Sequence, residues 1–240
     1  MQAYDINTMM LPDTAAESAN SSRKIAEEAA LESHLQALQE SLGELDAGAD
    51  PKARADVELQ IARTLVELHR GAEAWAIGRS IFDVFLQAED WESAADTCDV
   101  LFQAEQPQSL CALGQGIWLA VTYPIDPELS VELLNHVVDE TPDDSDGAAV
   151  AATTALFLAD LRAQGQQRES LMFFANQILG QVARGHSEVQ SQEAFDLWME
   201  RLELKEPDKF LVRLRNVVDV LVQDEWWFDR EALQARLEID

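Results

Sequence analysis

Helical hydrophobic periodicity runs through almost the whole chain after Ala53, and it limits the fold more than any other feature of the sequence. Apolar residues recur at helical spacing, Ala, Leu, Glu and Gln dominate, and stretches that alternate apolar with polar residues are missing. Turn-forming residues divide the chain into helix-sized spans, at Gly71, Glu89-Asp90, Gln106-Pro107, Tyr123-Pro124, Thr141-Pro142, Gly165, Gly185-His186 and Glu206-Pro207. Such short links place consecutive helices side by side in opposite directions. The pattern predicts an all-α fold of about ten helices.

Composition and periodicity divide the 240 residues into three parts. Residues 1–20 lack sustained periodicity and contain Pro12, so we expect a flexible N-terminal arm there. Residues 21–50 form one predicted helix, with leucines in steps of four and three: Leu31, Leu35, Leu38, Leu42 and Leu45. We expect this leucine seam to bury the face of Leu35, Leu38 and Leu42, either within the chain or in a homodimer. Residues 53–240 are the predicted helical-repeat domain, with capping helices at the C-terminus.

A faint internal repeat lies in the middle of the chain. Shifting the sequence by 36 residues matches Gly78 to Gly114, Ile81 to Ile117, Phe82 to Trp118 and Phe85 to Val121, then Ala94 to Ser130, Ala95 to Val131, Cys98 to Leu134 and Leu101 to Val137. Small residues recur where helices approach closely, and large apolar residues recur where they fill the groove between helices. The repeat predicts stacked helix pairs, with Gly78 and Gly114 at close helix contacts.

The stretch from Glu89 to Ala95, followed by Cys98, Leu101 and Pro107, resembles the second helix of a tetratricopeptide repeat. The resemblance covers about residues 73–143, with a looser unit at 147–184. It implies an all-α fold of antiparallel helix pairs stacked as a short tetratricopeptide-like solenoid. Proteins of this family are binding scaffolds rather than catalysts, and small acidic cytoplasmic ones include type III secretion chaperones. The resemblance therefore implies a non-catalytic adaptor or chaperone.

Acidic residues outnumber basic ones, with 45 Asp and Glu against 17 Lys and Arg, for a formal net charge of -28. This charge repels nucleic acid and anionic lipid, so we expect neither as a direct partner. No apolar run approaches the ~18 residues that a membrane span needs, and the N-terminus does not resemble a secretory signal. Two cysteines fit a reducing compartment. These features predict a cytoplasmic protein.

The charge is concentrated between Ser80 and Asp160, a stretch with 16 acidic residues and no Lys or Arg. It either keeps the protein soluble or attracts a partner protein with a basic surface. For binding, we expect the middle repeats to form an apolar groove with an acidic rim, which includes Asp83, Glu89, Glu92 and Asp96. The alternative is an acidic DNA mimic that blocks a nucleic-acid-binding protein. A mimic requires carboxylates spaced along a ridge as phosphates are.

Motifs for catalysis and for metal binding are missing from the sequence. No histidine has a glutamate three residues before it, as the ligands of a di-iron helical bundle require. The four histidines are expected at the surface or at helix ends: His34, His69, His136 and His186. Burial is expected to raise the pKa of Cys98, and a position near a helix start to lower that of Cys111. We predict no enzymatic activity, no cofactor and no metal.

Three consecutive aromatic residues, Trp226, Trp227 and Phe228, stand near the C-terminus between acidic residues. Three neighbours cannot share one helix face, because successive residues point about 100° apart. At least one ring is therefore expected to point away from the core and to serve as an anchor for a partner. The alternative is a corner between helices that buries all three rings. The preceding amphipathic stretch, with Arg213 and Arg215 beside it, is expected to cap the stack and to pair with acids of the body.

Overall fold

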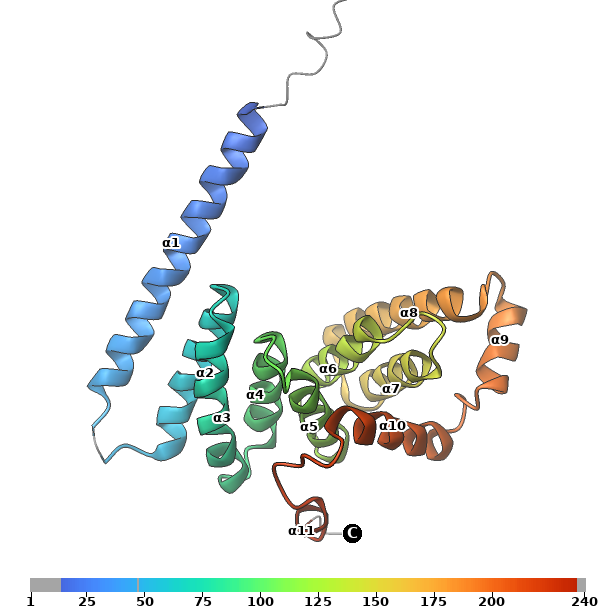
Figure 1. The fold of residues 1–240 in the computed structure, drawn as a ribbon. Coiled ribbons are helices and arrows are strands. Elements are labelled where there is room, and N and C mark those ends of the chain that lie inside the picture. Colours follow the sequence, from blue (N-terminus) through green and yellow to red (C-terminus); the bar gives the residue numbers. More distant parts are fainter. Residues whose placement is uncertain (1–13, 47, 237–240) are drawn as a thin grey trace, which may run out of the picture.

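The computed structural model describes residues 14–46 and 48–236, and every regular element in this part of the chain is an α-helix. The all-α prediction is confirmed for these residues. None of their helices is both long and apolar enough to cross a membrane. The helices run in the order α1 (Thr14–Glu44), α2 (Pro51–Glu67), α3 (Gly71–Gln87), α4 (Trp91–Gln103), α5 (Ser109–Thr122), α6 (Pro127–Glu140), α7 (Asp146–Arg162), α8 (Gly165–Ser187), α9 (Gln192–Arg201), α10 (Pro207–Val222) and α11 (Arg230–Gln234) (Figure 1).

Capping side chains and prolines determine where several helices begin. The Asp90 carboxylate accepts a hydrogen bond from the Ser93 amide at the start of α4. The Asp126 carboxylate accepts one from the Glu128 amide at the start of α6. Such caps satisfy amides that have no partner within the helix. Proline, whose missing N–H costs nothing in a first turn, begins α2, α6 and α10: Pro51, Pro127 and Pro207.

Glutamate residues in the left-handed conformation follow several helices, and the ends of α3 and α4 lie where the sequence breaks predict. Glu89 (φ 56°) follows α3, Glu105 (φ 53°) follows α4, and Glu188 (φ 50°) follows α8. The break expected at Gly185-His186 is wrong, because α8 continues through both residues to Ser187. A glycine costs a helix interior only about 1 kcal/mol relative to alanine, so Gly185 alone does not end the helix.

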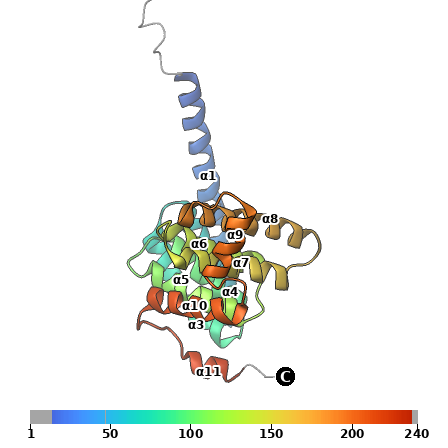
Figure 2. The ribbon, with the colours of Figure 1, turned by 90° about the vertical axis from the view of Figure 1, so that its right-hand side faces the viewer.

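Helix α1 stands away from the body of the molecule over its first half and packs against α2 over its second half (Figures 1 and 2). Leu35 is 2% exposed, and Leu38 and Leu42 are partly buried. The leucine seam therefore packs within the chain, while the homodimer stays a prediction. The helix begins at Thr14, earlier than the expected start at residue 21, so residues 14–20 are helical rather than part of an arm. Residues 1–13 of the predicted arm lie outside the described residues.

Helices α2 to α8 pack against their neighbours in chain order, as the short links predict. Helices α2, α4, α6 and α8 also contact one another in series. By contrast, α10 returns from the end of the chain and packs on α5 and α7 (Figure 1). Neighbour packing is thus observed, and the tetratricopeptide-like solenoid stays a prediction.

Helix α10 is amphipathic, and its apolar stripe is buried: Phe210, Leu214, Val218 and Val222. The Arg213 guanidinium contacts the Asp146 carboxylate of α7, with 2.8 Å between Nη2 and Oδ2. The expected pairing of this helix with an acid of the body is therefore confirmed for Arg213. Arg215 has a different partner, since it lies 3.9 Å from the carboxylate of Asp219 on its own helix.

Two glycines predicted at close helix contacts do lie there. A Cβ atom at Gly78 would come within 2.8 Å of Leu101 Cδ2, on α4. One at Gly114 would come within 2.5 Å of Val222 Cγ2, on α10. Real Cβ atoms do not approach other atoms so closely, so both helix contacts depend on the missing side chain.

Candidate protein-binding surfaces

The first candidate surface is an open pocket between α2, α4 and α6, with a volume of about 310 Å³. Five carboxylates and one guanidinium line it, and we call it the acidic pocket. It is lined by Arg63, Glu92, Ser93, Asp96, Asp126, Glu128, Leu129 and Glu132. The caps described above position it, because the first turns of α4 and α6 carry Glu92 and Glu128. The Glu92 carboxylate also accepts a hydrogen bond from the Asp126 amide at 3.1 Å, which joins the two helix starts.

The negative charge in the acidic pocket is only partly neutralised. The Arg63 guanidinium forms an ion pair with Asp96, but burial still raises the pKa of the Asp96 carboxyl above its usual range. Burial, together with the nearby Asp99 carboxylate, also raises the pKa of Glu132. A raised carboxyl pKa means that the ionised form is held at a cost in free energy. A cation entering the pocket would lower this cost.

A buried ion pair joins α4 to α6 beside the acidic pocket. The Asp99 side chain is 1% exposed, and its carboxylate accepts hydrogen bonds from His136 Nε2 at 2.9 Å and from Gln103 Nε2 at 2.5 Å. The Phe102 ring packs on the imidazole, with 4.6 Å between the ring centres. Burial lowers the pKa of His136, but the bond to Asp99 and the surrounding carboxylates outweigh it and raise the pKa overall. The raised pKa favours the imidazolium form of His136, which bonds to the buried Asp99 carboxylate.

His136 corrects the expectation that each histidine lies at the surface or at a helix end. It lies inside α6. Glu132 stands one turn earlier on the same helix, and Asp99 of α4 lies close to both side chains. Nitrogen and oxygen ligand atoms of these three residues lie within 4.8 Å of one another. Their atom types suit a divalent metal such as zinc, but Asp99 and His136 already bond to each other. Glu132 and His136 are spaced by four residues rather than three, a spacing that shares a helix face equally well.

The four acids predicted to bind a partner do not form one cluster. Glu92 and Asp96 line the acidic pocket. Asp83 is exposed on α3, and Glu89 is exposed after α3, where its carboxylate lies 3.6 Å from the Arg236 guanidinium. Their binding roles stay predictions. The structure adds acids of the same basic-free stretch that were not singled out: Asp126, Glu128 and Glu132.

The second candidate surface holds Glu225 to Phe228, which we call the aromatic segment. It is an irregular connection between α10 and α11 rather than a helix, so the helical argument for one outward ring is wrong. Each of Trp226, Trp227 and Phe228 is partly buried and packs against the core. Their role as partner anchors stays a prediction.

Aromatic rings from α3 and α5 receive the aromatic segment. The Trp227 ring meets Phe82 edge to face, with 5.2 Å between ring centres. The Phe228 ring lies 5.1 Å from Trp118 of α5. A cation also covers Trp227, since the Arg79 guanidinium lies 3.8 Å from the Trp227 ring centre. Such contacts each contribute roughly 0.5–1.5 kcal/mol beyond the area that they bury.

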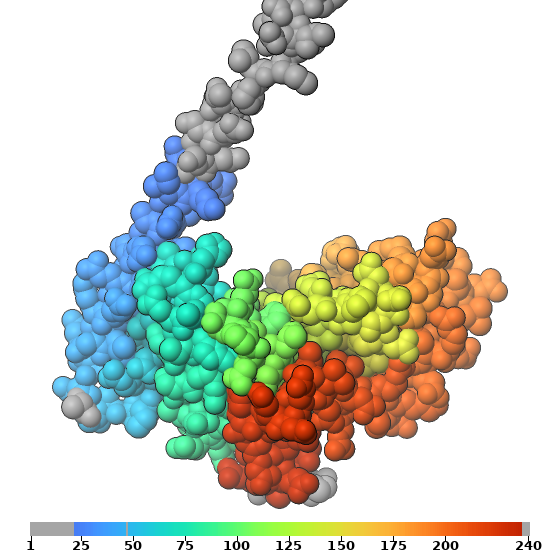
Figure 3. All heavy atoms as spheres, viewed as in Figure 1, coloured from blue at the N-terminus to red at the C-terminus, as the bar shows by residue number. Residues whose placement is uncertain are grey.

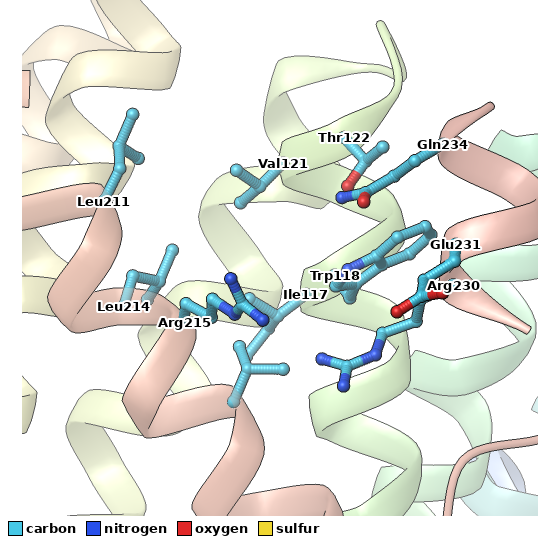
Figure 4. A pocket seen from close by; sticks show the side chains of 11 residues that line it. Ile117, Trp118, Val121, Thr122, Leu211, Leu214, Arg215, Arg230, Glu231 and Gln234 are labelled. Atoms are coloured by element: carbon cyan, nitrogen blue, oxygen red, sulfur yellow. The ribbon is translucent and has the colours of Figure 1, made fainter. Parts of the chain in front are cut away.

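A third hollow, of about 260 Å³, lies between α5, α10 and α11 (Figure 4). Its walls include Ile117, Trp118 and Leu214, and Arg215, Arg230 and Glu231 stand around them. Arg230 is engaged by Asp219, with 2.9 Å between Nη1 and Oδ1. Both charge signs are therefore present at this hollow, and neither dominates.

Neither cysteine has an activated thiol. Cys98 is buried, and burial raises its pKa well above the usual value, as predicted. Burial also raises the pKa of Cys111, so the expected lowering by the start of α5 is wrong.

Comparison of the chain with protein-family models, with curated proteins and with solved structures finds no match.

Proposed function

We propose that this protein is a non-catalytic, cytoplasmic adaptor or chaperone that binds a basic segment of a partner protein in the acidic pocket. One observation carries the proposal, namely that five carboxylates and only one guanidinium line the pocket between α2, α4 and α6. The raised pKa values of Asp96 and Glu132 support it, because burial makes their ionised forms costly and a bound cation would lower that cost.

A lysine or arginine side chain suits this pocket in charge and in shape. Its ammonium or guanidinium group would face carboxylates that the protein has already gathered, so little of the cost of ordering remains at binding. Its aliphatic stem would lie along Leu129, the apolar residue of the pocket wall. The wider negative stretch would raise the association rate at low salt, where the Debye length is long.

The DNA-mimic alternative gains less support from the same residues. A mimic needs carboxylates set along a ridge at the spacing of phosphates, whereas those of the acidic pocket line one hollow. That arrangement favours a cationic side chain over the surface of a nucleic-acid-binding protein. Purified DNA-binding proteins are the control ligands that distinguish the two functions.

Charge reversal at the pocket is expected to weaken binding of a basic peptide more than charge reversal elsewhere. The variant Glu92→Lys/Glu128→Lys changes two exposed side chains of the pocket, and a fluorescent lysine–alanine repeat peptide is the probe. We expect its Kd to rise about tenfold, equivalent to about 1.4 kcal/mol, in fluorescence anisotropy at low salt.

Glu28→Lys/Glu44→Lys is the matched control, because it changes two exposed acids of α1 and alters the net charge by the same amount. With the measurement repeated at physiological salt, where the Debye length is ~8 Å, we expect the control to change the Kd less than about twofold, since no residue of α1 lines the pocket. Equal weakening by both variants would show that only net charge matters, and would contradict the proposal.

A further inference from the structure

The aromatic segment lies on the body in the manner of a bound peptide. In Figure 3 the C-terminal residues, in red, lie on the surface next to residues of the green and teal helices. The segment has no helical hydrogen bonds of its own, so its backbone groups need partners elsewhere. Helix α5 supplies partners for the Glu225 carbonyl and the Trp227 amide, and the Glu225 amide donates to the Val222 carbonyl at the end of α10.

Two buried side chains of α5, Gln115 and Cys111, bond to the backbone of the segment, and the Cys111 thiol donates to the Glu225 carbonyl at 3.4 Å. Gln115, on α5, is 0% exposed, and its Nε2 donates to the Glu225 carbonyl at 2.9 Å. Its Oε1 accepts from the Trp227 amide at 3.3 Å. A side-chain amide that pairs with a backbone donor and a backbone acceptor of the same non-helical stretch recognises the main chain rather than particular side chains. Peptide-binding grooves use this kind of contact to hold extended chains.

The surface also has a donor that the segment leaves unsatisfied. Arg79 stacks on Trp227, but its Nη1 is buried and has no hydrogen-bond acceptor among the described residues. An unsatisfied buried donor is costly. A different segment that placed a carbonyl or carboxylate oxygen at this atom would bind with one more bond than the resident segment.

The connection to α10 favours exchange of the segment. Gln223, which lies between α10 and the aromatic segment, has φ 55° and ψ −128°, a strained conformation for a residue other than glycine. Residues 223–225 are exposed, and the three aromatic side chains are only partly buried. The segment is thus attached through a strained, exposed link, while the apolar stripe of α10 stays in the core.

We propose that the surface between α3 and α5 is a binding site for a non-helical peptide segment with neighbouring aromatic side chains, and that the aromatic segment occupies it as an intramolecular ligand. A partner protein would supply a segment of the same chemistry, with an oxygen acceptor for Arg79, and would displace residues 225–228. This site is separate from the acidic pocket, so it goes beyond the function proposed above, and either proposal can fail alone.

A triple variant empties the site for direct binding. Trp226→Ala/Trp227→Ala/Phe228→Ala removes the three rings from the full chain, and a fluorescent peptide with the sequence of residues 222–230 is the probe. We expect the peptide to bind this variant at least about tenfold more tightly than the wild type, because the resident segment competes at high effective concentration. Adding Gln115→Met, which keeps the volume but loses both amide contacts, is expected to weaken peptide binding by about tenfold.

A control peptide distinguishes specific binding at the site from nonspecific binding to the apolar surface that the triple variant exposes. A peptide with alanine at the three aromatic positions should not bind. Failure of the native peptide to bind a triple variant that keeps its helical circular dichroism would overturn the proposal, as would equal binding of both peptides. A wild-type dimer that the peptide dissociates would mean that a second copy, rather than a partner protein, is the occupant, and would overturn the assignment to a partner.

Hydrogen exchange of the wild-type protein tests the proposal without any variant. The Trp227 amide, which donates to Gln115, is expected to exchange at least about 100-fold faster than the core amides of α5, because the segment opens while the body stays folded. Exchange of that amide at the rate of the α5 core would mean that the segment is a permanent part of the fold. That result would overturn the proposal even if the triple variant does not fold.

Discussion

Replacing Phe82 with alanine is expected to lower the free energy of unfolding by about 4 kcal/mol. Phe82 is 0% exposed and lies beneath the Trp227 and Phe228 rings, so its removal opens a cavity between α3 and the aromatic segment. For a chain of 240 residues this corresponds to a fall in Tm of roughly 8–16 °C. Urea denaturation followed by circular dichroism measures the change.

Phe173→Ala is the matched control for this variant, because Phe173 is 66% exposed on α8. The same chemical change there should alter the free energy of unfolding by less than about 0.5 kcal/mol. The comparison therefore isolates burial from residue type. A Phe82→Ala variant as stable as Phe173→Ala would contradict the packing of the aromatic segment on α3.

The second large effect is expected at the buried ion pair. Replacing His136 with alanine leaves the Asp99 carboxylate buried with Gln103 as its remaining side-chain donor. Breaking a buried pair by removing one partner costs about 3 kcal/mol. Urea denaturation at about pH 6, just below the ordinary histidine pKa, measures this loss. His34→Ala is the control, because His34 is exposed on α1, and it should change stability by less than about 0.5 kcal/mol.

The cost of losing His136 is expected to depend on pH. Its pKa is raised in the folded protein, so protonation favours folding. The contribution is fully present below the unfolded pKa of about 6.5 and is lost as the pH rises through the raised folded value. The difference in stability between wild type and His136→Ala should therefore be larger at about pH 6 than at about pH 9. A difference that stays constant over this range would show that the imidazole acts by packing alone.

Local signals in the sequence predicted much of the fold. The breaks at Gly71, Gly165 and Pro207 lie where α3, α8 and α10 begin, because turn residues act on their own neighbours. Gly78 and Gly114 were also predictable, since a repeated small residue at helical spacing indicates close approach. The partner of Gly114 was not, because α10 is distant in sequence and its position depends on packing rather than on any repeat.

The candidate surfaces were harder to predict, for physical reasons. The stretch without basic residues indicated an acidic binding surface, but charge alone does not predict which acidic side chains lie close together in the fold. Asp126 and Glu128 join Glu92 only because capped first turns of α4 and α6 lie together. Trp227 was expected in a helix, yet its neighbours on the body come from α3 and α5, far away in the chain. Long-range contacts of this kind leave no periodic signal.

Mapping where a basic peptide binds the wild-type protein tests the central claim most directly. The unlabelled lysine–alanine repeat peptide is titrated into ¹⁵N-labelled protein, and changes in backbone amide chemical shifts are recorded at low salt. The acidic pocket predicts that the largest changes gather at the first turns of α4 and α6 and around Arg63 of α2. It also predicts that they shrink as salt shortens the Debye length. Changes spread evenly over the acidic residues of the chain, α1 included, would contradict it.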